Sequence, residues 1–182
     1  EKGIYYALLC ADNGEQLNEE SLHHQLERFQ ITFRKFFDCE FAIYYGALDS
    51  QQAICDLVRT LKKAGQNNVG RKEGIHNVQE KRQTEREAEE HYCENWVQLL
   101  ENELYDTVVK DASDTLQRLA VEDQLNSRNL MRFYQKSMGA IYLVLQKLNM
   151  DMDQLFPEEE TMQRAMSAYT YTEDTLWLVK YV

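Results

Sequence analysis

Helix breakers are almost absent from this sequence, which holds one proline and seven glycines in 182 residues. Leu, Gln, Glu, Lys and Met, which lose little rotamer freedom in a helix, are plentiful. With 43% hydrophobic residues, the chain can bury the core of one generous domain or of two small ones. The sequence therefore predicts a helix-rich globular protein.

Two short apolar runs stand out in residues 1–70. Residues 4–11 (IYYALLCA) and 41–48 (FAIYYGAL) are rich in strand-forming residues, and a turn signal, Asp12-Asn13-Gly14, follows the first. We predict that both are strands. Their aromatic residues, with those of the segment between them, are expected to form one core: Tyr5, Tyr6, Phe33, Phe36, Phe37, Tyr44 and Tyr45.

Helical spacing separates these runs. Residues 18–37 place apolar side chains three and four positions apart, with Asn18 or Ser21 as the cap, and residues 51–64 do the same before Gly65. The element order predicted for residues 1–70 is therefore βαβα.

Residues 71–91 are highly charged and hold few large apolar residues, so we predict a charged helical connector that acts as a movable joint. Residues 92–182 show helical spacing only, interrupted at Pro157. Helices are expected near 96–119, 126–148, 159–168 and 172–182, the last with Thr172 as a capping hydroxyl. The predicted fold class is α+β, mostly α, ending in a helical bundle of four or five helices.

The formal net charge of −11, with no dense cluster of Lys and Arg, disfavours direct binding of nucleic acid. No apolar run is long enough for a membrane span and no secretory signal is seen, so the expected location is the cytoplasm. Cys10, Cys39, Cys55 and Cys93 form no Cys-x-x-Cys pair and are expected to be small, half-buried hydrophobic residues.

Motifs of catalysis and of cofactor binding are absent from the sequence, so we expect no enzyme activity, no cofactor and no metal. His23 and His24 are adjacent, so on a helix their side chains diverge by about 100° and cannot share one metal ion. His91 has helical spacing to Glu87 and Glu94, but a solvated surface explains this better than a ligand pair.

A family resemblance enters at residues 41–70 (FAIYYGALDSQQAICDLVRTLKKAGQNNVG). This stretch resembles the closing third of a GGDEF domain, where a "v-t-i-S-x-G" strand precedes a helix of the pattern "l-x-x-A-x-x-A-l-x-x-A-K-x-x-G-x-N-x-v". The matching positions are Ile43, Gly46, Ala53, Leu57, Leu61, Lys63, Gly65, Asn67 or Asn68, and Val69. The signature Gly-Gly-Asp/Glu-Glu-Phe does not occur, so no metal or GTP residue is carried over.

The whole chain is similar to the central region of AraC-type two-component response regulators of the YesN kind, which are bacterial. Residues 96–119 resemble their "l-x-x-a-l-x-x-g-d-x-x-x-v-x-x-x-l-x-x-l" pattern, with 102–106 in place of the Gly-Asp turn, and residues 130–156 and the closing TYTEDTLWLVKYV resemble the family's tail. The resemblance implies a receiver domain and a helix-turn-helix DNA-binding domain in the parent chain as partners. It also implies a non-catalytic role in signal transduction and transcription regulation, with a homodimer as an open option.

One alternative is a small-molecule sensor, in which the helical bundle encloses an effector pocket. Its lining would be aromatic side chains at helical spacing: Trp96, Tyr134, Tyr142 and Trp177. A working nucleotide cyclase or hydrolase is the least favoured alternative because the signature is missing.

Overall fold

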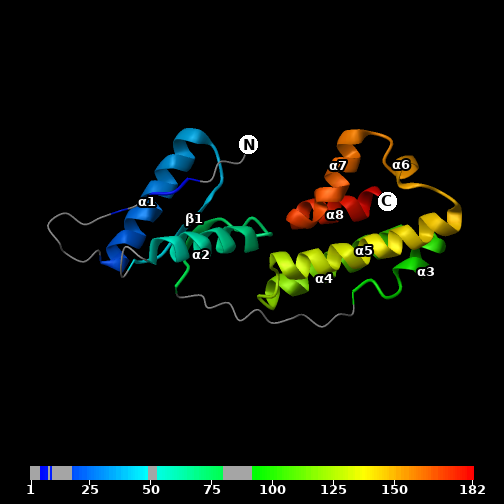
Figure 1. The fold of residues 1–182 in the computed structure, drawn as a ribbon, viewed down its shortest axis with the longest axis horizontal. Helices are drawn as coiled ribbons and strands as arrows, with labels where there is room; N and C mark the ends of the chain where they lie inside the picture. Colours follow the sequence, from blue (N-terminus) through cyan, green and yellow to red (C-terminus); the bar gives the residue numbers. More distant parts are fainter. Residues whose placement is uncertain (1–4, 8, 10–17, 49–52, 80–91) are drawn as a thin grey trace.

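The computed structural model describes residues 5–7, 9, 18–48, 53–79 and 92–182. An αβ segment, the described residues between 18 and 79, occupies one end of the molecule, and a helical bundle, residues 92–182, occupies the other (Figure 1). The predicted fold class, α+β and mostly α, is confirmed.

Helix α1 (Glu19–Phe37) follows directly from its sequence signals. The Asn18 side chain accepts a hydrogen bond from the backbone N–H of Glu20 (3.0 Å), so Asn18 is the cap. Acidic residues occupy the first turn and basic residues the last, as the helix dipole favours. The helix ends at Asp38, which has a left-handed backbone (φ 45°).

The sheet of the αβ segment has two parallel strands, β1 (Ala42–Tyr45) and β2 (Gly74–Asn77), connected through α2 (Ile54–Asn67). The register pairs Ala42 with Gly74 and Tyr45 with Asn77. Parallel neighbours require such a crossover, so this is a βαβ unit. Strand β1 lies within the predicted strand at 41–48. The described part of the predicted helix at 51–64 is confirmed from Ile54, although α2 continues past Gly65 to Asn67.

Strand β2 corrects the prediction of a helical connector over 71–91. Ile75 is the only β-branched residue of the strand, and the charged residues around the strand hid the signal. Parallel pairing with β1 decides the conformation here, since it satisfies the backbone groups of a segment with little intrinsic preference. Residues 80–91 lie outside the described part.

The predicted aromatic core of the αβ segment is wrong in most of its members. Tyr5 and Phe36 are 93% and 78% exposed, and no residue of α1 is buried. Phe33, itself part-buried, contacts the rings of Phe37 at 4.3 Å and of Phe41 at 5.1 Å between centroids, and Phe37 is largely exposed. A two-stranded sheet offers too little surface to cover them.

The predicted strand at 4–11 is described only at 5–7 and 9, and these residues are not in a strand. Tyr6 is half exposed. The other positions of that prediction lie outside the described residues, so the observed order within the αβ segment is αβαβ.

Three helices open the bundle: α3 (Trp96–Glu101), α4 (Tyr105–Val121) and α5 (Ser127–Leu148). The predicted helical stretch 96–119 is interrupted at Asn102–Leu104, where Glu103 has a positive φ of 58°. The expected long helix at 126–148 is present, because the Asn126 side chain accepts from the N–H of Asn129 (3.0 Å) and caps it.

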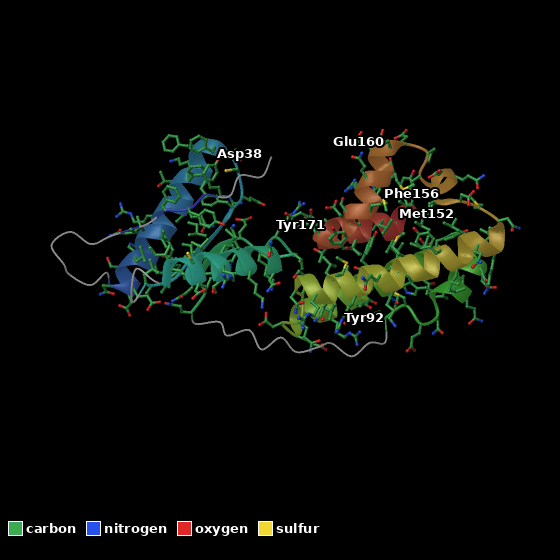
Figure 2. All side chains as sticks on the ribbon, viewed as in Figure 1. Asp38, Tyr92, Met152, Phe156, Glu160 and Tyr171 are labelled. Atoms are coloured by element: carbon green, nitrogen blue, oxygen red, sulfur yellow. The ribbon has the colours of Figure 1, made fainter. Side chains whose placement is uncertain are left out.

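Three further helices and one 3-10 turn complete the chain: α6 (Met152–Leu155), α7 (Glu159–Ser167), η3 (Ala168–Thr170) and α8 (Thr172–Tyr181). Helix α6, not expected from the sequence, starts with a capping box between Asp151 and Gln154. Met152 and Phe156 lie on the side of the bundle occupied by α6 and α8 (Figure 2), and the Phe156 ring stacks on that of Tyr181 at 5.2 Å.

Helix α5 forms the centre of the bundle and contributes to two hydrophobic clusters. Cluster 1 contains Phe133 and Ala140 with side chains of α3 and α4, and cluster 2 contains Met138, Ile141 and Leu145 with side chains from 156 onward. Helix α8 bridges them, because Val179 belongs to cluster 1 and Leu178 to cluster 2.

Two glycines give a matched test of this architecture. Gly74 begins β2 with φ +123°, a conformation that L side chains rarely adopt, whereas Gly139 lies within α5 and a Cβ there would meet open space. We expect Gly74→Ala to lower the free energy of unfolding by about 1–3 kcal/mol. Gly139→Ala is expected to raise it by roughly 0.5–1 kcal/mol. Thermal unfolding measures both changes. Equal effects of the same sign would contradict the strained backbone at Gly74 and the open helical position of Gly139.

Candidate functional site: the loop joining the αβ segment to the bundle

The joint loop, residues 68–72, connects α2 to the approach of β2 and is closed by one side chain. Asn68 accepts from the N–H of Lys72 through Oδ1 and donates to the Lys72 carbonyl through Nδ2, both at 2.7 Å. The Arg71 N–H also donates to the Asn68 carbonyl (3.1 Å), and Arg71 has a left-handed backbone (φ 49°). These hydrogen bonds hold the two ends of the loop together, so its tip projects from the αβ segment.

Val69, at the tip of the joint loop, is buried in the bundle. Its exposure is 1%, and it belongs to cluster 1 with Trp96, Leu119 and Phe133. Burying a valine side chain stabilises a fold by roughly 1.5–3 kcal/mol. The contact with the bundle therefore gives the αβ segment an apolar anchorage that its own sheet does not supply.

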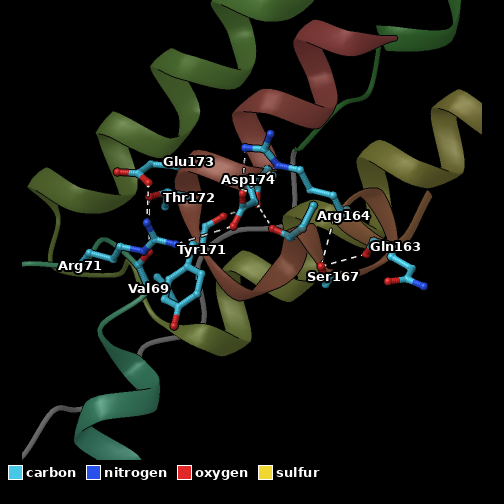
Figure 3. Close-up of polar contacts among 11 residues, drawn as sticks. Val69, Arg71, Gln163, Arg164, Ser167, Tyr171, Thr172, Glu173 and Asp174 are labelled. Atoms are coloured by element: carbon cyan, nitrogen blue, oxygen red, sulfur yellow. Dashed lines mark hydrogen bonds and ion pairs between the residues drawn. The ribbon is translucent and has the colours of Figure 1, made fainter. Parts of the chain in front are cut away.

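The backbone of Val69 also caps a bundle helix. Helix α8 has no side-chain cap of its own; instead, the Val69 carbonyl accepts from the N–H of Thr172 (3.1 Å) and from the Thr172 hydroxyl (3.4 Å), as Figure 3 shows. The prediction that the Thr172 hydroxyl caps its own helix is thus wrong. The first N–H of α8, which has no partner within the helix, is satisfied by the joint loop.

Charged and aromatic side chains extend the contact across the start of α8. Arg71 pairs with Glu173 (2.8 Å), lies over the Tyr171 ring (4.0 Å to its centroid) and reaches Asp174 at 3.9 Å. Arg164 of α7 meets Asp174 from the other side at 3.1 Å. Because these pairs are partly exposed, each stabilises the contact between the joint loop and α8 by only about 0–1 kcal/mol. Their main effect is to orient the joint loop.

A cavity of about 330 Å³ opens beside the joint loop. Its walls come from α2, β2 and the loop between α4 and α5, which adds Asp123 and Leu125. Asn67 lines it and accepts a hydrogen bond from the Ser127 hydroxyl (2.7 Å) through Oδ1. Burial raises the pKa of Tyr44, another lining residue, while its hydrogen bond with Asn68 opposes that rise. The cavity is thus shared by the αβ segment and the bundle.

The structure distributes the four residues of the predicted effector pocket over the bundle. Trp96 is 1% exposed within cluster 1, and its Nε1 donates to Asp111 (2.6 Å). Tyr134 and Trp177 pack against cluster 2, and Tyr142 is half exposed. Trp96 thus belongs to a different cluster from the one that Tyr134 and Trp177 contact, and none of the four lines the cavity at the joint loop.

The described cysteines differ in burial, and burial raises the pKa of one of them. Cys93 is part-buried with its Sγ 3.5 Å from the Ser137 hydroxyl, and burial raises the pKa of its thiol to about 12, with the Asp111 carboxylate adding to the rise. Cys39 is also part-buried, whereas Cys55 is exposed, contrary to the expectation for it. Cys10 lies outside the described residues.

The paired histidines of α1 face a carboxylate. His23 and His24 lie 3.6 and 3.5 Å from Glu27. Across the described part of the chain, no three His, Cys, Asp or Glu side chains are grouped as metal ligands would be. His91 lies outside that part. None of the described helices combines the length and the apolar character needed to cross a membrane.

Comparisons with protein families, with curated proteins and with solved structures find no match to this chain.

In the sequence, Val69 stands out only as the last position of the family pattern at 41–70, and its burial in the bundle was not predicted. One signal could have found it: Val69 is an isolated apolar residue within Asn67-Asn68-Val69-Gly70, a run of turn-forming residues. Such a residue has no helical or strand face of its own, so it must be exposed or be buried by another part of the chain.

Truncating Val69 tests the anchorage. We expect Val69→Ala to lower the free energy of unfolding by roughly 1.5–3 kcal/mol, because it removes buried methyl groups and leaves a cavity in cluster 1. For a chain of this size the melting temperature falls by about 2–4 °C per kcal/mol. The matched control is Val121→Ala at the end of α4, where the side chain is 80% exposed. Equal losses in the two variants would show that Val69 is not buried by the bundle.

The raised pKa of Cys93 predicts selective alkylation. At pH 8 the Cys93 thiol stays almost wholly protonated, since its pKa of about 12 lies far above that pH, and the thiol is a poor nucleophile. Iodoacetamide should therefore label Cys55 in the folded protein and spare Cys93, with both labelled after unfolding. Peptide mass spectrometry measures each site separately; labelling of Cys93 as fast as Cys55 in the folded protein would contradict its burial.

Proposed function

We propose that this chain is a non-catalytic, cytoplasmic signal-relay module of an AraC-type two-component transcription regulator, lying between a receiver and a helix-turn-helix DNA-binding domain. The family part of this proposal rests on the sequence resemblance. The relay part is supported by one observation: Val69 is buried in the bundle core while its carbonyl caps α8.

A relay needs an element whose displacement changes contacts in both the αβ segment and the bundle. The joint loop meets this requirement because Asn68, directly after α2, closes its base, and Val69 at its tip contacts cluster 1 and helix α8 of the bundle. A displacement of α2 would pull Val69 from cluster 1 and its carbonyl from the first N–H of α8. Helix α8 would then lose its N-terminal partner, so a change in the αβ segment would reach the end of the described chain.

The size of the expected effect follows from the contacts. A coupling free energy of about 1–3 kcal/mol is typical of allosteric proteins and corresponds to a change of about 5–150-fold in affinity. The burial of Val69 alone is of this magnitude. The charge pairs of Arg71 are too exposed to supply it, so Val69 is the residue on which the relay depends most.

The full-length parent protein provides the test. Phosphorylation of its receiver should increase affinity for the target DNA in the unaltered protein, and Val69→Ala should reduce this gain while leaving the affinity of the unphosphorylated protein within about twofold. Fluorescence anisotropy with labelled operator DNA measures both states.

Arg59→Ala is the matched control, because the Arg59–Asp56 pair is exposed and lies in the first half of α2, whereas the joint loop follows the last residue of that helix. It should keep the full gain. An undiminished gain in Val69→Ala would contradict the relay, and a parent gene without receiver and helix-turn-helix coding sequences would remove the family assignment.

A further inference from the structure

We propose that α1 is a self-association surface, and that its exposed aromatic face pairs antiparallel with the same face of a second copy of this chain. The aromatic face is defined by positions that recur every three or four residues along α1: Leu22, Leu26, Phe29, Phe33 and Phe36, with Phe37 beside them. Helix α1 lies on the side of the αβ segment away from the bundle (Figure 1), and none of its residues is buried. The proposal concerns association alone and holds whether or not the chain acts as a relay.

The aromatic face is large enough for a weak dimer. Phe29, Phe36 and Phe37 are 52%, 78% and 65% exposed, and Phe33 joins them through ring contacts with Phe29 (5.5 Å) and Phe37 (4.3 Å). Because an aromatic side chain can bury about 150–250 Å², the three exposed rings leave roughly 300–500 Å² of apolar surface in water. Two copies would bury roughly twice this area, which is below the about 1,200 Å² of a stable complex and is typical of a reversible one.

The spacing of the aromatic face is self-complementary. Its positions are symmetric about residue 31, so in an antiparallel pair Leu26 lies opposite Phe36 of the second copy. Phe29 likewise lies opposite Phe33, as a two-fold symmetric contact requires. The positions that flank the face carry no charge: Gln25, Gln30 and Thr32. Two copies can therefore bring their apolar side chains together without burying a charged group between them.

The charges of α1 favour a second copy of the same helix, in antiparallel orientation. All its carboxylates precede all its Lys and Arg residues: Glu19, Glu20 and Glu27, then Arg28, Arg34 and Lys35. With three acidic and three basic residues, α1 has no net formal charge, although the chain carries −11. Packed helices lie about 8–10 Å apart, within about one Debye length, so an antiparallel pair places the acidic half of each helix near the basic half of the other. A parallel pair would align like charges.

Analytical ultracentrifugation of the unaltered chain tests the proposal. We expect a reversible monomer–dimer equilibrium, with the average mass rising between about 10 and about 500 µM, the range of a weak interface. Growth beyond a dimer would contradict a two-fold contact. A chain that stays monomeric would overturn the proposal. If Phe36 were then required for binding to phosphatidylcholine vesicles or to the parent protein's receiver domain, the aromatic face would be assigned to that partner instead.

Truncating one ring locates the contact. Phe36→Ala should raise the dissociation constant of the dimer about tenfold or more, because each copy loses a ring that is buried on association. The ring is largely exposed in the single chain, so the variant should fold normally, which circular dichroism checks. Ile31→Ala is the matched control, because Ile31 is exposed on the same helix but lies roughly 200° around it from Phe29. Equal weakening in the two variants would overturn the surface.

A charge exchange tests the orientation. In the antiparallel pair Glu27 of one copy lies opposite Lys35 of the other, so Glu27→Lys and Lys35→Glu should each raise the dissociation constant about two- to fivefold. The double variant should restore it. The single variants change the net charge in opposite directions, so opposite effects would show that overall repulsion decides the association. A double variant no tighter than the single ones would overturn the antiparallel pairing.

Discussion

The burial of Val69 by the bundle is the contact on which the arrangement of this protein depends. Among the described residues before Tyr92, Val69 is the one hydrophobic side chain that is buried. A two-stranded parallel sheet with one crossover helix is too small to hold a core of its own. The αβ segment is therefore stabilised through the joint loop, and α8 obtains its N-terminal hydrogen-bond partner from the same residue. The bundle thus supplies the apolar burial that the αβ segment lacks, and the joint loop supplies the cap that α8 lacks.

Local signals were sufficient to predict most helices, for physical reasons that individual residues make clear. Asn18 and Asn126 cap α1 and α5 as their spacing to the apolar stripes suggested, and the apolar run at 41–48 contains β1. Strand β2 could not be predicted in this way, because charged residues surround it and pairing with β1 decides its conformation. The prediction of an aromatic core was wrong for a related reason. Strand propensity does not give the number of strands, and two strands are too few to cover Phe36.

The site was not accessible to the same reasoning. Val69 and Arg71 both lie about a hundred residues before Thr172 in the sequence, and only the folded chain brings the joint loop to the start of α8. Aromatic residues at helical spacing suggested a pocket, but Trp96 is enclosed in cluster 1, as large apolar side chains of a bundle usually are. The cavity beside the joint loop is lined by residues of α2, β2 and a helix–helix loop that are far apart in the sequence, a combination with no sequence pattern.

Coupling through the joint loop is the central claim, and hydrogen exchange at the Thr172 amide tests it most directly. That N–H donates to the Val69 carbonyl, so its protection reports whether the loop is in place. The comparison is between the unaltered chain and Gly74→Ala, a change confined to β2. We expect faster exchange at the Thr172 amide in the variant, with exchange at Ile141 in the middle of α5 unchanged. Unchanged exchange at Thr172 in a variant whose β2 amides exchange faster would show that the two parts are independent.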